Sequence, residues 1–256
     1  MARLEIHQFI CRSDNFGVLI HDHVAKVTAS IDTPDADKIA TEAENNGWKI
    51  THILNTHHHG DHTGGNLAMK SRCGAIVVGP RAEAAKIPGL DVAVGEGDTY
   101  RFGNFEARVL DTPGHTAGHI SYWLPQAGVA FVGDTMFSLG CGRLLEGTAE
   151  TMWRSLSKLM ALPPETLIYC GHEYTAANAR FALSIEPENE KLQARAREVG
   201  DLRAAGKPTL PVRLGLELET NPFLRPSSPM IQTRLGMAGR PLHEIFGEVR
   251  LRKDKA

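Results

Sequence analysis

The sequence predicts an α+β protein: two packed β-sheets with helices on the outside, followed by a small all-helical region. Over about the first 170 residues the strand and helix signals alternate, whereas about the last 85 residues read as almost entirely helical. The histidine and aspartate residues that are candidate metal ligands all follow predicted strands. Loops at strand ends place functional side chains on a rigid scaffold. A chain of 256 residues is long enough for one large domain or for a domain with an appendage.

The expected strands are short apolar or alternating segments bounded by turn residues. They cover residues 4–9, 16–20, 24–31, 49–55, 75–79, 99–102, 105–110, 119–124, 129–133 and 166–170. The strand at 49–55 runs directly into a cluster of histidines. This order of elements predicts that several strands end close to one site.

Two helices have clear start signals in the first part of the chain. Thr33 is expected to cap the first helix, with Pro34 at its first position, and Gly47 to end it. Its buried stripe is Ala36, Ile39, Ala40 and Ala43. Thr148 is expected to cap the second helix, whose apolar face is Met152, Trp153, Leu156, Leu159 and Met160. Later helices are expected at residues 175–183, 189–205, 232–235 and 242–253, separated by Pro/Gly-rich segments at 206–211 and 221–229.

Composition narrows the possible partners. The net charge is −2 and the isoelectric point is about 6.6, so nothing overall favours a nucleic-acid or membrane partner. The longest apolar stretches are about five or six residues, far below the ~20 that span a bilayer. No apolar segment of the secretory type follows the N-terminal strand. We therefore expect a soluble cytoplasmic protein. A monomer is expected too, although nothing in the sequence fixes the oligomeric state.

The four cysteines, at positions 11, 73, 141 and 170, are widely spaced and include no C-x-x-C pair. In a chain of this length they are expected to be reduced thiols and not a disulfide framework. Cys141 and Cys170 lie close in sequence to candidate site residues. Metal ligation is the alternative for these two, although we expect small buried side chains.

The most informative stretch is residues 56–62, Thr-His-His-His-Gly-Asp-His. His57 and His59 are two residues apart, so an extended backbone points both rings to one side. Gly60 lets the chain turn and bring Asp61 and His62 back to the same place. Imidazole and carboxylate together suit zinc, iron or manganese better than calcium or magnesium. This spacing predicts ligands for two adjacent metal ions.

Three further segments supply the remaining ligands, each at a strand end. His115 lies in the turn 112–119, Asp134 follows the apolar strand at 129–133, and His172 follows the strand at 166–170. We expect His57, His59 and His115 to bind one ion and Asp61, His62 and His172 to bind the other. Asp134 would be shared. His58 should face away from the ions, and His119 is expected to form a hydrogen bond near the site.

On these motifs the chain resembles the metallo-β-lactamase superfamily and, over nearly its whole length, the glyoxalase II (hydroxyacylglutathione hydrolase) family. The resemblance rests on T-H-H-H-G-D-H at 56–62, T-P-G-H-T-x-G-H at 112–119, F-V-G-D-T at 131–135, C-G-R-L-L-E-G-T at 141–148, G-H-E-Y-T at 171–175, N-P-F-L-R at 221–225 and R-L-R-K at 250–253. The first motif is typical of the superfamily, and the later ones are typical of glyoxalase II.

The resemblance implies an αββα metallo-β-lactamase-like sandwich over residues 1–172 and a helical glutathione-binding domain over 173–256. It implies hydrolysis of S-D-lactoylglutathione to D-lactate and glutathione, the second step of methylglyoxal detoxification. Two divalent ions, zinc in preference to iron or manganese, would hold a bridging hydroxide assisted by Asp61 and Asp134. Matching positions assign the glutathione contacts to Arg143, Tyr174, Arg250 and Lys253. The chain departs from many family members at Leu145, where an aromatic residue and any hydroxyl contact from it are missing.

Other functions are compatible with some of the same residues. A metallo-β-lactamase proper is disfavoured, because the best-known zinc classes place cysteine where Asp134 stands and are exported. A nuclease would need a strongly basic surface. A glutathione persulfide dioxygenase of the same fold, with a single iron, is the main alternative, although it resembles the helical C-terminal region less. A closed structural metal site is disfavoured, since seven ligands around two ions leave room for water.

Overall fold

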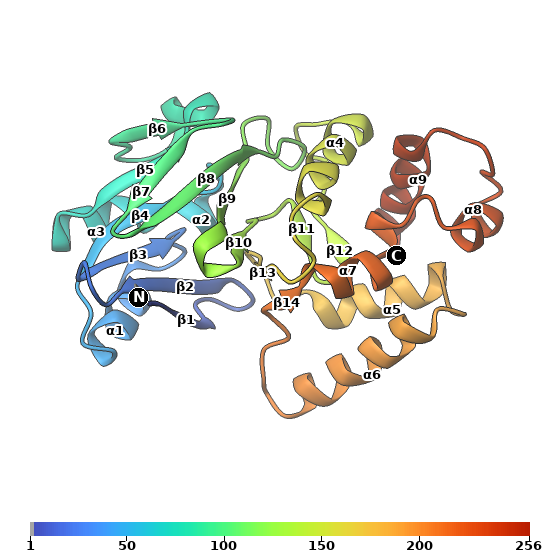
Figure 1. Ribbon diagram of the computed structural model, residues 1–256, viewed down its shortest axis with the longest axis horizontal. Coiled ribbons are helices and arrows are strands. Elements are labelled where there is room, and N and C mark those ends of the chain that lie inside the picture. Colours follow the sequence, from blue (N-terminus) through green and yellow to red (C-terminus); the bar gives the residue numbers. More distant parts are fainter. Residues whose placement is uncertain (1–2) are drawn as a thin grey trace. The chain divides into compact units, whose positions relative to one another are not determined.

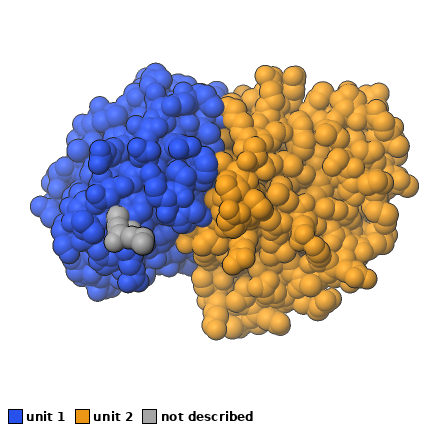
Figure 2. Space-filling view, in the orientation of Figure 1, with its two compact units in different colours: residues 1–111, 116–133 blue, residues 112–115, 134–256 orange. Residues whose placement is uncertain are grey.

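The computed structural model describes residues 3–256, and these form two compact units. Unit 1 comprises residues 1–111 and 116–133, with the first two residues outside the description, and unit 2 comprises residues 112–115 and 134–256 (Figure 2). These units are defined by how the chain packs in space. The domain boundary predicted from the sequence, between residues 172 and 173, is a different kind of division and stays a prediction.

Unit 1 contains a mixed six-stranded sheet in the order β1-β2-β3-β4-β5-β6 (Figure 1). The strands β1 to β3 are antiparallel, and β3 to β6 are parallel. Their bounds are β1 Leu4–Ile10, β2 Phe16–Asp22, β3 Val27–Ile31, β4 Ile50–Leu54, β5 Ile76–Pro80 and β6 Val92–Val94. Every residue of β2 is buried, as expected for a strand covered on both faces.

A second run of strands in unit 1 is antiparallel throughout: β7 Thr99–Phe102, β8 Phe105–Asp111, β9 Ile120–Leu124 and β10 Val129–Phe131. It meets the first sheet through the ring of His52, 5.4 Å from that of Phe102, and through the Tyr122 hydroxyl, which donates to the Asn55 carbonyl at 2.9 Å. The fold class is therefore the predicted α+β arrangement of two sheets with helices outside.

Helices α1 Ala36–Asn45 and α3 Asn66–Cys73 cover the outer face of the first sheet. Ile39, Ala40 and Ala43 of α1 are buried against strand side chains such as Leu19 and Val77. The predicted stripe is thus confirmed at three of its positions, while Ala36 is half-buried. The short helix α2 Gly60–Thr63 lies within the histidine motif, and a 3₁₀ helix, η1, covers Arg81–Lys86.

The predicted cap of the first helix was wrong. Asp35 is the cap, because its carboxylate accepts hydrogen bonds from the backbone N–H groups of Asp37 and Lys38, both at 3.0 Å. The backbone of Thr33 is engaged elsewhere: its N–H donates to the His62 carbonyl at 2.7 Å, and its carbonyl accepts from Gly65 at 2.9 Å. Thr33 therefore fixes the histidine loop and does not start the helix.

Strand β3 begins at Val27 and not at the predicted residue 24. The buried Asp22 carboxylate accepts hydrogen bonds from the N–H groups of Val24 and Ala25, at 2.8 and 3.1 Å, and so closes a turn there. Lys26 completes the turn with a φ of 58°. Burial opposes ionisation of Asp22, yet hydrogen bonds to the carboxylate from Asn104, Ala25 and Val24 lower its pKa.

Unit 2 contains the short hairpin β11 Met136–Phe137 with β12 Gly140–Cys141, the antiparallel pair β13 Leu167–Tyr169 with β14 Val212–Arg213, and helices throughout the remainder. The helices are α4 Ala149–Met160, α5 Thr175–Ile185, α6 Glu190–Ala204, α7 Leu214–Thr220, α8 Pro229–Leu235 and α9 Leu242–Asp254, and a 3₁₀ helix, η3, covers Pro222–Leu224. Thr148 caps α4 as predicted, accepting from the Thr151 N–H at 3.2 Å. Helices α2, α3 and α7 and the short strands β6, β11, β12 and β14 were not predicted.

Aromatic contacts and one buried carboxylate hold the helices of unit 2 together. The ring of Phe223 lies 5.8 Å from that of Phe181 on α5 and 6.2 Å from that of Phe246 on α9. The fully buried Glu217 of α7 accepts hydrogen bonds from the Ser138 hydroxyl, the Leu139 N–H and the Asn221 amide, at 2.7 to 2.9 Å. Glu217 thereby joins α7 to the hairpin that follows Asp134.

Candidate metal centre and substrate pocket

In unit 1 the chain leaves β4 and enters the histidine motif directly, so the predicted ligands of this unit converge. The Nε2 atom of His57 lies 3.1 Å from Nδ1 of His59, and the ring centroids of His57 and His62 are 4.1 Å apart. The Oδ2 atom of Asp61 lies 3.5 Å from Nε2 of His62. His57 and His62 are buried, whereas His59 and Asp61 are half-exposed, which leaves one side open to a ligand.

Asp32, which directly follows β3, orients this cluster and was missed by the sequence reasoning. Its carboxylate lies 2.8 Å from Nδ1 of His62 and accepts from both the N–H and the hydroxyl of Thr56 at 2.8 Å. A carboxylate on Nδ1 fixes the tautomer and leaves Nε2 available to a metal ion. The only sequence signal was an aspartate directly after a buried strand.

His119 packs in the same unit as a fully buried ring, stacked on His57 with a centroid distance of 4.8 Å. Its predicted hydrogen bond near the site stays a prediction. Gly133, which directly precedes Asp134, lies against it: a Cβ at this position would come within 2.6 Å of His119 Nε2 and 2.5 Å of Thr56 Oγ1. With a φ of +47° as well, only glycine fits there without a shift of its neighbours.

In unit 2 the other three predicted ligands include a carboxylate between two imidazoles. The Oδ2 atom of Asp134 lies 3.5 Å from Nε2 of His115 and 3.4 Å from Nε2 of His172. All three side chains are buried. Nδ1 of His115 lies 3.0 Å from the Arg143 carbonyl, which directs Nε2 toward the carboxylate. An aspartate in this position has the donor atoms that a bridging ligand would need.

Glu83 of η1 is a second positioning residue that sequence reasoning missed. Its buried carboxylate accepts from the His58 N–H at 2.8 Å and from the Gly118 N–H at 2.9 Å, and Oε2 lies 2.9 Å from His58 Nδ1. The His58 ring thus pairs with Glu83 and also lies 5.0 Å from the ring of His59, and its orientation away from the ions stays a prediction. One carboxylate thus fixes two loops that carry candidate site residues.

We expect Glu83→Gln to weaken metal binding by about 10–100-fold, the range typical of groups that orient metal ligands. The amide nitrogen of glutamine would face an N–H donor, so one of the two backbone bonds is lost. The measurement is a competitive titration of the metal-loaded protein with a chelator. Glu106→Gln, at an exposed position of β8, is the matched control. Equal metal affinities of wild type and Glu83→Gln would show that Glu83 has no part in holding the ligands.

The four predicted glutathione contacts line one hollow of 390 Å³ in unit 2, together with Phe137 and Cys141. Arg143 is largely exposed, with 72% of its side chain accessible, and Tyr174 stacks on His172 with ring centroids 4.7 Å apart. Lys253 donates to the Ala177 carbonyl at 3.2 Å. Leu145 is exposed and is not among the lining residues. Arginine, lysine and tyrosine here offer donors to carboxylates.

Arg250 is the buried member of this group. Its Nη1 donates to the Cys141 carbonyl at 2.9 Å, and its guanidinium lies 5.2 Å from the centroid of the Phe223 ring. Burial raises the pKa of the neighbouring Cys141 thiol to about 11, against the opposing effect of Arg250, and burial also raises the pKa of Cys170. All four cysteines are free thiols, as predicted, and these two are small buried side chains.

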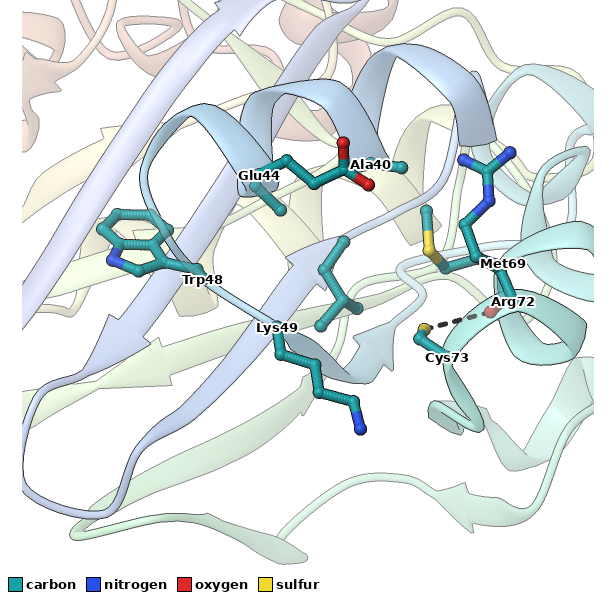
Figure 3. A pocket seen from close by; sticks show the side chains of 9 residues that line it. Ala40, Glu44, Trp48, Lys49, Met69, Arg72 and Cys73 are labelled. Carbon is teal, nitrogen blue, oxygen red and sulfur yellow. Dashed lines mark hydrogen bonds between the residues drawn. The ribbon is translucent and has the colours of Figure 1, made fainter.

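A second hollow, of 300 Å³, lies in unit 1 among α1, α3 and the start of β4 (Figure 3). Its charged lining residues are Glu44, Lys49 and Arg72, of mixed sign, and none of the predicted ligands lines it. Cys73 donates to the Met69 carbonyl at 3.0 Å, and burial raises the pKa of this thiol. This hollow therefore offers neither a nucleophile nor a set of ligands for the chemistry.

Comparison with known proteins agrees with this geometry. Residues 29–172 match the model of the metallo-beta-lactamase superfamily, and residues 173–256 match that of the hydroxyacylglutathione hydrolase C-terminus. A curated hydroxyacylglutathione hydrolase from Brucella anthropi is 55% identical over 98% of this chain and 97% of its own. The chain belongs to the hydroxyacylglutathione hydrolase family. Within the superfamily fold, its His/Asp clusters are sites for divalent metal ions.

Two solved structures of the same fold are similar to this family member. The crystal structure of ETHE1 from Myxococcus xanthus has a TM-score of 0.68 and 26% identity, and covers 97% of this chain and 98% of its own. TTHA1623, solved in a di-iron-bound form, has a TM-score of 0.60 and 25% identity, covering 84% of this chain and 98% of its own. No helix among residues 3–256 has the length and apolar character that crossing a membrane requires.

Proposed function

We propose that the protein is a metal-dependent thioester hydrolase that converts S-D-lactoylglutathione and water to D-lactate and glutathione. The observation that carries the proposal is the full-length likeness to curated hydroxyacylglutathione hydrolases, joined to a hollow lined by Arg143, Tyr174, Arg250 and Lys253. Glutathione has two carboxylates and one ammonium, so its conjugates need a basic pocket. This activity would place the protein in the second step of methylglyoxal detoxification.

The metal centre we propose holds two divalent ions, zinc in preference to iron or manganese. Its ligands would be His57, His59 and His115 for one ion and Asp61, His62 and His172 for the other, and Asp134 would be shared. The proposal is supported by a donor set that consists only of nitrogen and oxygen atoms. The Asp32 carboxylate directs Nε2 of His62, and the Arg143 carbonyl directs Nε2 of His115. The similar protein TTHA1623 was solved in a di-iron-bound form. When bound, the ions supply an activated water and positive charge for the developing oxyanion.

The chain's own residues perform the remaining steps. Asp61 or Asp134 would accept a hydrogen bond from the attacking water or hydroxide and so orient its lone pair toward the thioester carbonyl. Arg143, Tyr174, Arg250 and Lys253 bind the tripeptide and fix the carbonyl in place. The leaving thiol has an ordinary pKa of about 8.5, so it departs as a thiolate without a dedicated acid. Buried Cys141 and Cys170 have raised pKa values and do not compete as nucleophiles.

Removing the metal is expected to abolish turnover of S-D-lactoylglutathione, and adding back zinc, manganese or ferrous iron to restore it. Loss of the thioester absorbance, measured together with metal content, checks this. A lactoyl thioester of a small thiol without the tripeptide is the matched substrate, and its KM should be far higher. Fully metallated protein that leaves the glutathione thioester intact would contradict the proposal. Oxygen uptake with glutathione persulfide would instead support the dioxygenase alternative, which the named relatives do not favour.

A further inference from the structure

One acidic side chain stands among the cations of the proposed glutathione pocket. Asp254, the last residue of α9, has its Oδ1 atom 3.0 Å from Nη2 of Arg250 and 3.9 Å from Nε of Arg143. It lines the hollow, and 35% of its side chain is accessible. A carboxylate at the C-terminal end of a helix is disfavoured by the helix dipole, so the two guanidinium groups are what hold it there.

The surroundings of Arg250 leave little room for a second anion. Nη1 is engaged by the Cys141 carbonyl, and the Phe223 ring lies 5.2 Å from the guanidinium carbon. Nη2 is the nitrogen that faces a carboxylate, and that carboxylate belongs to Asp254. Because only 6% of Arg250 is accessible to solvent, its charge needs an anionic partner at all times. An incoming carboxylate that uses the same N–H of Nη2 takes the place of Asp254.

We propose that Asp254 is an internal competitor that occupies, in the free protein, the position taken by a carboxylate of the bound glutathione moiety. Binding is then an exchange of one carboxylate for another on Arg250, with Arg143 available to both. This inference rests on the proposed function. The exchange lowers the affinity for substrate and for glutathione alike, since both have the same carboxylates. The consequence is a faster release of the tripeptide product.

The test is calorimetric titration of metal-loaded protein with glutathione itself, which binds without reacting. Asp254→Asn keeps an oxygen for Arg250 and removes the charge, so glutathione should bind about three- to tenfold tighter than to wild type. The melting temperature of the free variant should fall, and glutathione should raise it more than it raises that of wild type. Glu248→Gln is the matched control, because this carboxylate of the same helix pairs with Arg252 outside the pocket.

Each outcome of the titration supports or overturns the exchange. Unchanged or weaker binding by Asp254→Asn, with normal binding by wild type, would overturn the inference and leave the proposed function intact. It would mean that Asp254 only positions Arg250 or accepts the substrate ammonium. If neither wild type nor variant binds glutathione, the assignment of the substrate fails and the inference fails with it. Asp254→Ser, smaller and also uncharged, is the second variant and should show the same gain in affinity.

Discussion

Asp134→Asn should lower kcat for the glutathione thioester by more than about 100-fold, the upper end of the range seen when outer partners of metal ligands are removed. Asp134 is buried, with Oδ2 3.5 and 3.4 Å from the Nε2 atoms of His115 and His172. Asparagine offers one neutral oxygen and an NH₂ group, which cannot bridge two cations. The loss should appear in kcat and in metal content together.

The measurement is steady-state kinetics at saturating metal, with metal content determined on the same samples. Asp201→Asn, at an exposed position of α6, is the control for removing one carboxylate from unit 2 and should behave as wild type. If the Asp134→Asn variant still bound two metal ions and kept full turnover, the assignment of Asp134 as the shared ligand would be wrong. A fall in kcat with unchanged metal content would assign Asp134 to the handling of the water proton.

Glu217→Ala is expected to produce the largest loss of stability, about 3 kcal/mol or more in the free energy of unfolding. The substitution removes the acceptor shared by three buried donors. They are the Ser138 hydroxyl, the Leu139 N–H and the Asn221 amide. The Asn221 amide still donates to the Phe137 and Gly140 carbonyls, so two donors are left unsatisfied, each at a cost of about 1–3 kcal/mol. Leu139 is also held at a φ of 57°, which a leucine seldom adopts and which this contact helps to fix.

Denaturant unfolding of the metal-free protein measures the effect. Glu219→Ala on the same helix is the control, since its exposed pair with Lys191 contributes at most about 1 kcal/mol.

Burial raises the pKa of Glu217 above its ordinary 4.5, so the folded state keeps this proton to higher pH than the unfolded state does. The contribution of Glu217 to stability is therefore fully present below the ordinary value and falls as pH rises from there through the raised pKa of the folded state. Relative to wild type, Glu217→Gln should lack this fall, and equal pH profiles would contradict the assignment.

The elements predicted from hydrophobic periodicity were confirmed where the pattern was long, as in α4 and α6. The seven predicted ligands fell into two convergent groups, one in each unit, because strand ends and a two-residue spacing are local signals. The division of domains and the roles of the individual ligands stay predictions. Helix α7 was missed because leucine alternates with glycine or glutamate over residues 214–219. This alternation has no helical period, and a glycine disfavours a helix.

Residues that act through distant partners could not be found in the sequence. Asp32 and Glu83 are ordinary acidic residues until the fold joins them to groups that lie 24 and 35 positions away along the chain. Thr33 had the residue type of a cap, but its backbone was already committed to the loop of His62. Local propensity identified the candidates here, and tertiary hydrogen bonding decided among them.

The close contact at Gly133 bears on how readily new specificities could arise in this protein. A single added methyl group there would collide with His119 and Thr56, so the residue before Asp134 tolerates almost no mutational drift. Leu145 and Arg143, by contrast, project into solvent further along the chain. Exposed positions of this kind can vary without such collisions, and a library aimed at other thioesters should vary Leu145 while keeping residue 133 invariant.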